Sequence, residues 1–194
     1  MVYRIIALCI LLAFYGCYFI KMLMQRRRGI QTNQMGRGKT GFVKFVEILL
    51  RIATAIVPAA EVISIVVNTA PLPSPLRIAG ALIAFVGVAA FITAVVQMRD
   101  SWRAGVPTED KTDLVTGGIF GISRNPAFLG FDLVYLGILL MFFNYALLVA
   151  SLFAAVMIHL QIVNVEEEFL LKAFGENYLE YKKRVNRYLG VKSR

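Results

Sequence analysis

The sequence contains little charge for a chain of its length. Charged residues make up only 17% of its 194 residues, against about a quarter in an ordinary soluble domain. Hydrophobic residues account for 58%, and they gather in runs close to the ~20 residues that cross a bilayer. Both observations argue against a soluble domain and predict an all-α integral membrane protein.

Cysteine and histidine are also scarce. The two cysteines, Cys9 and Cys17, share the first apolar run, and the single histidine is His159, far along the chain. Because no His, Asp or Glu lies beside the cysteines, they form no recognisable metal site, and nothing indicates a disulfide. We expect no bound metal, and we expect both cysteines to face lipid or to pack as small residues.

Five apolar runs predict five transmembrane helices. A cleaved signal peptide would carry its charge before the apolar core, but here Arg26, Arg27 and Arg28 follow the first run, which we therefore expect to remain as a helix. Asn144 alone separates the last two runs, so these two helices should form an antiparallel hairpin. The five runs are 2–23, 42–67, 76–98, 127–143 and 145–163.

The basic residues predict the orientation of these helices. Loops 25–44 and 98–126 and the tail after residue 163 hold 17 of the 21 Lys and Arg residues. The positive-inside rule places all three segments in the cytoplasm and the N-terminus outside. Because the charge follows topology and no nucleic-acid-binding motif accompanies it, we expect no nucleic-acid partner.

One stretch between apolar runs is rich in glycine. Residues 114–130, LVTGGIFGISRNPAFLG, hold four glycines and an Arg-Asn-Pro triplet. Glycine permits positive φ and close backbone approach, and Pro126 can open a helix whose N-terminus favours an anionic group. The stretch is therefore either a ligand-binding turn or an ordinary cytoplasmic loop.

The C-terminal tail predicts an amphipathic helix. Leu170, Phe174, Tyr178 and Tyr181 recur at intervals of three and four residues, which places them on one helix face. Such a helix could lie on anionic headgroups or pack on the cytoplasmic loops, and Gly175 could bend it. Of the three acids at 166–168, at most two can point inward.

The glycine-rich stretch and the tail EEEFLLKAFGENYLEYKKRV together resemble the isoprenylcysteine carboxyl methyltransferase family, in particular a small archaeal-type member with five spans. The resemblance covers about residues 100–190, and phospholipid methyltransferases share much of the pattern. The sequence departs from it at Asn125, where the family usually has His, and at Phe120 and Phe128, where it usually has Tyr. An amide cannot titrate, so a proton transfer by that His would be absent here.

The resemblance implies a membrane-embedded methyltransferase that uses S-adenosyl-L-methionine and methylates the carboxylate of a prenylcysteine-like lipophilic substrate, either a small molecule or a peptide. The C-terminal helix would then cover a cofactor pocket, and membrane lipid would be a second partner. It implies a catalytic region at 99–194, which includes the hairpin 127–163, after three helices in 1–98. The cofactor residues carried over from the family are Thr112, Asp113, Leu114, Val115, Gly118, Phe120, Asn125, Pro126, Ala127, Phe128, His159, Asn164 and Glu167.

Arg124 and Glu167 are the expected catalytic residues. A bidentate Arg can hold a carboxylate, so we expect Arg124, with Arg103 behind it, to bind the substrate. One alternative is methylation of a phospholipid or another lipid amine. Another is a transport subunit in which Glu61, Asp132 and His159 form an intramembrane polar path, although Glu61 and His159 are more often packing residues.

Overall fold

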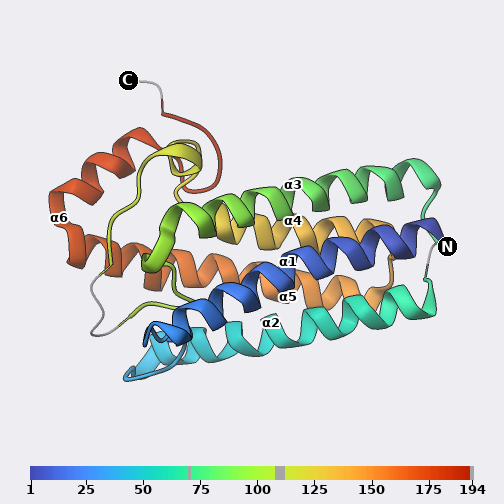
Figure 1. The fold of residues 1–194 in the computed structure, drawn as a ribbon, viewed down its shortest axis with the longest axis horizontal. Helices are drawn as coiled ribbons and strands as arrows, with labels where there is room; N and C mark the ends of the chain where they lie inside the picture. Colours follow the sequence, from blue (N-terminus) through green and yellow to red (C-terminus); the bar gives the residue numbers. More distant parts are fainter. Residues whose placement is uncertain (70, 108–111, 193–194) are drawn as a thin grey trace.

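The computed structural model describes residues 1–69, 71–107 and 112–192, and it is helical throughout its regular parts (Figure 1). Two basic residues that enter the topology argument, Lys111 and Arg194, lie outside the described residues. The α-helices are α1 Val2–Arg27, α2 Gly41–Val67, α3 Ser74–Met98, α4 Pro126–Met141, α5 Tyr145–Gln161 and α6 Glu167–Arg184. Shorter helical turns are η1 Arg99–Ser101, η2 Gly118–Gly121 and the π-helix η3 Ile162–Glu166.

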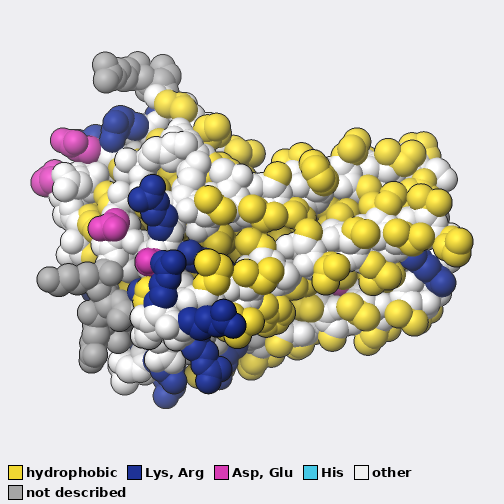
Figure 2. Space-filling view, viewed as in Figure 1, with side chains coloured by type: hydrophobic (Ala, Val, Ile, Leu, Met, Phe, Trp, Pro, Cys, Tyr) yellow, Lys and Arg dark blue, Asp and Glu magenta, His cyan; other side chains and the backbone are white. Residues whose placement is uncertain are grey.

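The expected integral membrane protein is confirmed. Helices α1, α2, α3 and the continuous α5–α6 helix are long and apolar enough to cross a bilayer, and α4 is a shorter apolar helix of 16 residues. Apolar side chains cover most of the visible bundle, whereas Lys and Arg gather mainly at one end (Figure 2). We call this the polar end; it carries α6 and the segments 28–40, 99–107 and 112–125.

Four glycines bring the backbones of α3 and α4 into direct contact. Gly80 and Gly87 on α3 face Gly137 and Gly130 on α4, and each pair is spaced by seven residues, or two helical turns. A β-carbon added at Gly137 would lie 2.5 Å from the Gly80 carbonyl oxygen. Small residues are the usual means of close helix packing in lipid, and the two helices lie side by side along their length (Figure 1).

The α4–α5 hairpin forms as expected, and Asn144 closes it. The Asn144 side chain accepts a hydrogen bond from Leu147 N at 2.9 Å, which caps α5, and donates one to Ser64 Oγ at 2.7 Å on α2. A cap of this kind is worth about 1 kcal/mol. Asn144 therefore fixes the turn and also attaches the hairpin to α2.

The last membrane helix does not end near residue 163, as the apolar runs suggested. It continues through the π-helix Ile162–Glu166 into α6, because no glycine or proline interrupts the backbone there. The chain bends instead at Gly175, where φ is +51°. The C-terminal half of α6 then packs on the segment around η2, as the loop-packing alternative predicts (Figure 1).

The cysteines behave as the sequence predicts. Both are free; Cys9 is exposed on the apolar surface and Cys17 is half-buried.

We predict that Gly137→Ala destabilises the bundle, whereas Gly16→Ala does not. A methyl group at Gly137 meets backbone atoms of α3, which cannot move aside as a side chain can, so a loss of about 1–3 kcal/mol is expected. Nothing lies within 4 Å of the corresponding position at Gly16. Thermal melting of both variants in detergent tests this, and equal melting temperatures would contradict it.

Candidate functional site

A cavity of about 600 Å³ runs from the polar end into the helical bundle. Residues from α1, α2, α3, α4, α5, the segment before η2 and α6 all line it, so it lies where elements distant in sequence meet. Its lining includes Tyr15, Tyr18, Phe19, Arg51, Thr54, Pro58, Phe91, Trp102, Arg103, Asp113, Leu114, Val115, Phe120, Arg124, Asn125, Pro126, Ala127, Phe128, Phe131, Glu166 and Tyr181.

Most of the residues predicted for the cofactor lie on this cavity. Those that line it are Asp113, Leu114, Val115, Phe120, Asn125, Pro126, Ala127 and Phe128, together with the expected substrate residues Arg103 and Arg124. Those outside its lining are Thr112, Gly118, His159, Asn164 and Glu167. The structure thus brings the two sequence motifs together, while the role of each residue remains a prediction.

Arg124 connects the start of α4 to α6. Its Nη2 lies 3.1 Å from Glu167 Oε1, and its Nη1 donates to the Tyr178 hydroxyl at 2.7 Å. The guanidinium is nearly buried, yet its Nε has no hydrogen-bond partner among the described residues. A buried donor without a partner is costly, and Arg124 is one of the residues that line the cavity.

Glu167 does not line the cavity; it holds three basic groups together. Besides Arg124, Arg187 Nε donates to its Oε1 at 2.7 Å and Lys182 Nζ donates to its Oε2 at 3.1 Å. Burial alone would raise the pKa of Glu167, but these hydrogen bonds and the charge of Arg124 lower it to about 2. Glu167 is therefore a permanent anion that ties α6 and residue 187 to the start of α4.

Glu166, one residue earlier, does line the cavity, as Asp113 also does. Gln161 Nε2 donates to its Oε1 at 3.1 Å, but burial outweighs this contact and raises the pKa of Glu166 to about 7. Successive residues of a helix point in different directions, and the π-helix that ends here adds a residue to the turn. Glu166 was not among the site residues predicted from the sequence, although its place in the acidic triplet 166–168 was the available signal.

Another buried acid fixes the polar end of α2. Glu47 is fully buried and accepts hydrogen bonds from Lys39, from Gly36 N at 2.6 Å and from Val106 N at 3.3 Å. Gln161 also approaches Glu47 at 3.4 Å. Gln161 also donates a hydrogen bond to Glu166. It therefore links α2 and its flanking segments to a residue that lines the cavity.

The C-terminal segment 185–192 is hydrogen-bonded to the glycine-rich turn. Gly190 N donates to Ile122 O at 2.8 Å, and Arg124 N donates to Asn186 O at 3.1 Å. The Asn125 side chain donates to Arg187 O at 3.1 Å. Tyr188 packs on His159 and hydrogen-bonds it, so His159 has a protein partner.

A second hollow of about 650 Å³ opens beside the cavity, and the two share Met98, Asp113 and Val115. Its wall requires glycine at Gly118, where φ is +58° and where a β-carbon would overlap the Gln97 side chain. Gln97 in turn accepts a hydrogen bond from Ile119 N at 3.1 Å. The polar and charged residues of its lining are Gln97, Arg99, Asp100, Ser101 and Asp113.

Comparison with known proteins identifies similar sequences. The model of the phospholipid methyltransferase family matches residues 76–177, from α3 into α6. Protein-S-isoprenylcysteine O-methyltransferase of Saccharomyces cerevisiae is 34% identical over 82 residues, which are 41% of this chain and 34% of that protein. The protein of the same name from Xenopus laevis is 36% identical over 76 residues, 39% of this chain and 26% of that protein. The chain thus spans about a third or less of the length of these relatives.

We predict that Glu167→Gln lowers stability at neutral pH and that this difference falls to less than half at pH 3. A pKa near 2 in the folded state, against about 4.5 unfolded, contributes about 3 kcal/mol above pH 4.5. That contribution is lost as the pH falls through 2. Melting curves at pH 7 and pH 3 measure it, with Glu168→Gln as the control because Glu168 is exposed and pairs only with Lys172 among the described residues. Equal melting of both variants at pH 7 would contradict the prediction.

Proposed function

The chain belongs to the phospholipid methyltransferase family, and from this premise we propose that it transfers a methyl group from S-adenosyl-L-methionine to the carboxylate of a prenylcysteine-like lipophilic acceptor. One observation carries the proposal. A single cavity joins a charged region around Arg103, Arg124 and Glu166 to an apolar region between α1 and α2. That shape suits an acceptor with a charged head and an apolar tail.

The residues at the charged region fit a cationic methyl donor. When bound, S-adenosyl-L-methionine supplies an activated methyl group on a positively charged sulfur. The Glu166 carboxylate and the aromatic faces of Phe120 and Phe128 line the cavity and would favour such a cation. The predicted contributions of Asn125 and its neighbours to this site are part of the proposal.

The same region suits an anionic acceptor. A carboxylate is ionised at neutral pH because its pKa is near ~4, so no general base is needed to make it a nucleophile. Arg124 Nε, a buried donor without a partner among the described residues, would hold and orient it. The apolar walls exclude water from it, and alignment with desolvation is what this displacement requires.

The orientation follows from charge. Lys and Arg concentrate at the polar end (Figure 2), and the positive-inside rule assigns that end to the cytoplasm and the N-terminus to the opposite side. The cofactor would enter from the cytosol through the second hollow, while the acceptor's tail remains in lipid. A prenylated acceptor prefers the bilayer, which suits a cavity that opens among membrane helices.

A lipid amine is the second candidate acceptor. The description of the matching family favours it, and so does Glu166, because a carboxyl group with a pKa of about 7 could take the proton that an ammonium must lose. The two candidates differ in their response to Arg124, since an amine gains nothing from a guanidinium.

We predict that Arg124→Lys lowers kcat/KM for a prenylcysteine analogue by about 10- to 100-fold. Lysine keeps the positive charge beside Glu167 but removes the Nε donor. Radiolabelled methyl transfer to a farnesylcysteine analogue and to phosphatidylethanolamine measures the effect, with Arg28→Lys as the exposed control. Transfer to the phospholipid alone, or equal rates in both variants, would overturn the carboxylate assignment.

We also predict that cofactor affinity rises up to about tenfold between pH 6 and pH 8. Glu166 loses its proton near pH 7, and only its ionised form attracts the sulfonium. Calorimetric titration of the purified protein with S-adenosyl-L-methionine tests this. Glu166→Gln should bind more weakly at pH 8 and show a flat profile, whereas Glu168→Gln should follow the unmodified protein. A flat profile in the unmodified protein would rule out Glu166 as the cation's partner.

A further inference from the structure

The cavity has a definite depth along the helices that line it. On α2 its lining residues run from Leu50 to Pro58, and on α1 from Phe19 to Tyr15. An α-helix rises about 1.5 Å per residue, so Pro58 lies about 12 Å along α2 from Leu50 and Tyr15 about 6 Å along α1 from Phe19. Tyr15 and Pro58 are the members of this lining farthest from the polar ends of α1 and α2.

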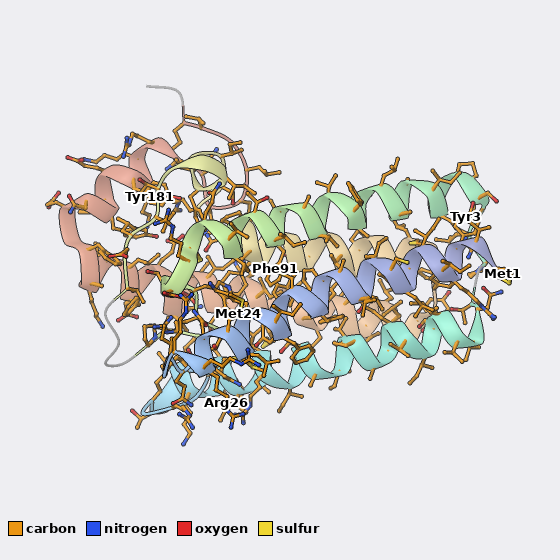
Figure 3. All side chains as sticks on the ribbon, viewed as in Figure 1. Met1, Tyr3, Met24, Arg26, Phe91 and Tyr181 are labelled. Atoms are coloured by element: carbon orange, nitrogen blue, oxygen red, sulfur yellow. The ribbon has the colours of Figure 1, made fainter. Side chains whose placement is uncertain are left out.

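Aromatic side chains from the opposite helices complete this deep end. Phe91 on α3 and Phe131 on α4 line the cavity there and pack edge to face, with ring centroids 5.2 Å apart. Phe91 lies in the middle of the bundle, between α3 and α1 (Figure 3). Phe91 is fully buried, and close-packed rings of this kind have little room to move.

Tyr15 differs from these rings because it is fixed by a polar contact. Its hydroxyl donates to Glu61 Oε2 at 2.9 Å, and Glu61 is fully buried in α2. Glu61 is not part of the cavity lining, so it holds the tyrosine from behind. A carboxyl group at this depth is costly unless it has a hydrogen-bond partner, and a tyrosine hydroxyl away from water also needs one. The contact between Tyr15 and Glu61 satisfies both groups.

We propose that Tyr15, held by Glu61, forms the floor of the acceptor channel and sets the longest tail that the protein accepts. The inference rests on the proposed function, because it assumes that the cavity takes the acceptor's tail. Isoprenoid tails differ by whole five-carbon units, so a fixed floor discriminates between them in steps. Tyr15 is thus a specificity-determining residue that acts at the opposite end from the reacting group.

The test compares tail lengths in variants of the floor and of the mouth. Tyr15→Ala removes the ring and should shift the preference between farnesyl- and geranylgeranylcysteine analogues toward the longer tail by about tenfold. Tyr15→Leu, which retains more of the packing, should shift it in the same direction by less. Tyr15→Phe keeps the ring but loses the Glu61 contact, and should broaden the preference. Phe19→Ala removes a ring at the half-exposed mouth and should weaken all tails alike.

A binding measurement separates this inference from the proposed function. Unreactive isoprenols of ten, fifteen and twenty carbons are titrated against the same variants, with thermal stabilisation as the readout. A length preference that moves in Tyr15→Ala and Tyr15→Leu supports the floor, even if no methyl transfer is found. An unchanged length ranking in folded Tyr15 variants, whether in binding or in transfer, overturns it.

Discussion

The polar end depends on one buried carboxylate. Glu167 binds Arg124 at the start of α4, Lys182 within α6 and Arg187 in the C-terminal segment. Without that anion three cations would be close together and partly out of water, an arrangement that costs several kcal/mol. The ion cluster therefore requires that the glycine-rich turn, α6 and segment 185–192 fold together, and the first two of these contribute residues to the cavity lining.

The two neighbouring acids show how one turn of chain supports both stability and chemistry. Glu167 is paired with three cations and has a lowered pKa, whereas Glu166 accepts a hydrogen bond from the Gln161 amide and has a raised pKa. Both residues are glutamates, so the difference between their pKa values arises from the direction in which each side chain points. Glu167 is thereby kept ionised at any physiological pH, while Glu166 gains or loses its proton near neutral pH.

Much of the architecture was predictable because lipid imposes simple rules. The apolar runs predicted the membrane helices, Asn144 predicted the hairpin turn and Pro126 the start of α4.

The continuity of α5 into α6 was not predictable from hydropathy, which reports where polarity changes but not whether the backbone is interrupted. The lining contributed by Tyr15 and Pro58 was missed for another reason: both residues lie outside the family pattern, which covers only about residues 100–190, and contacts between residues so far apart in the sequence leave no local signal. The division into 1–98 and 99–194 remains a prediction, and the cavity draws its lining from both sides of it.

The glycine contact between α3 and α4 has a consequence for hydrocarbon chains in the bilayer, which cannot pass between these two helices. Where backbone oxygens lie at the position that a methyl group would need, a hydrocarbon chain cannot slip through. That seam is closed along two helical turns. At the seam between α1 and α2, by contrast, Phe19 and Ala55 border the cavity and are also exposed on the outer surface.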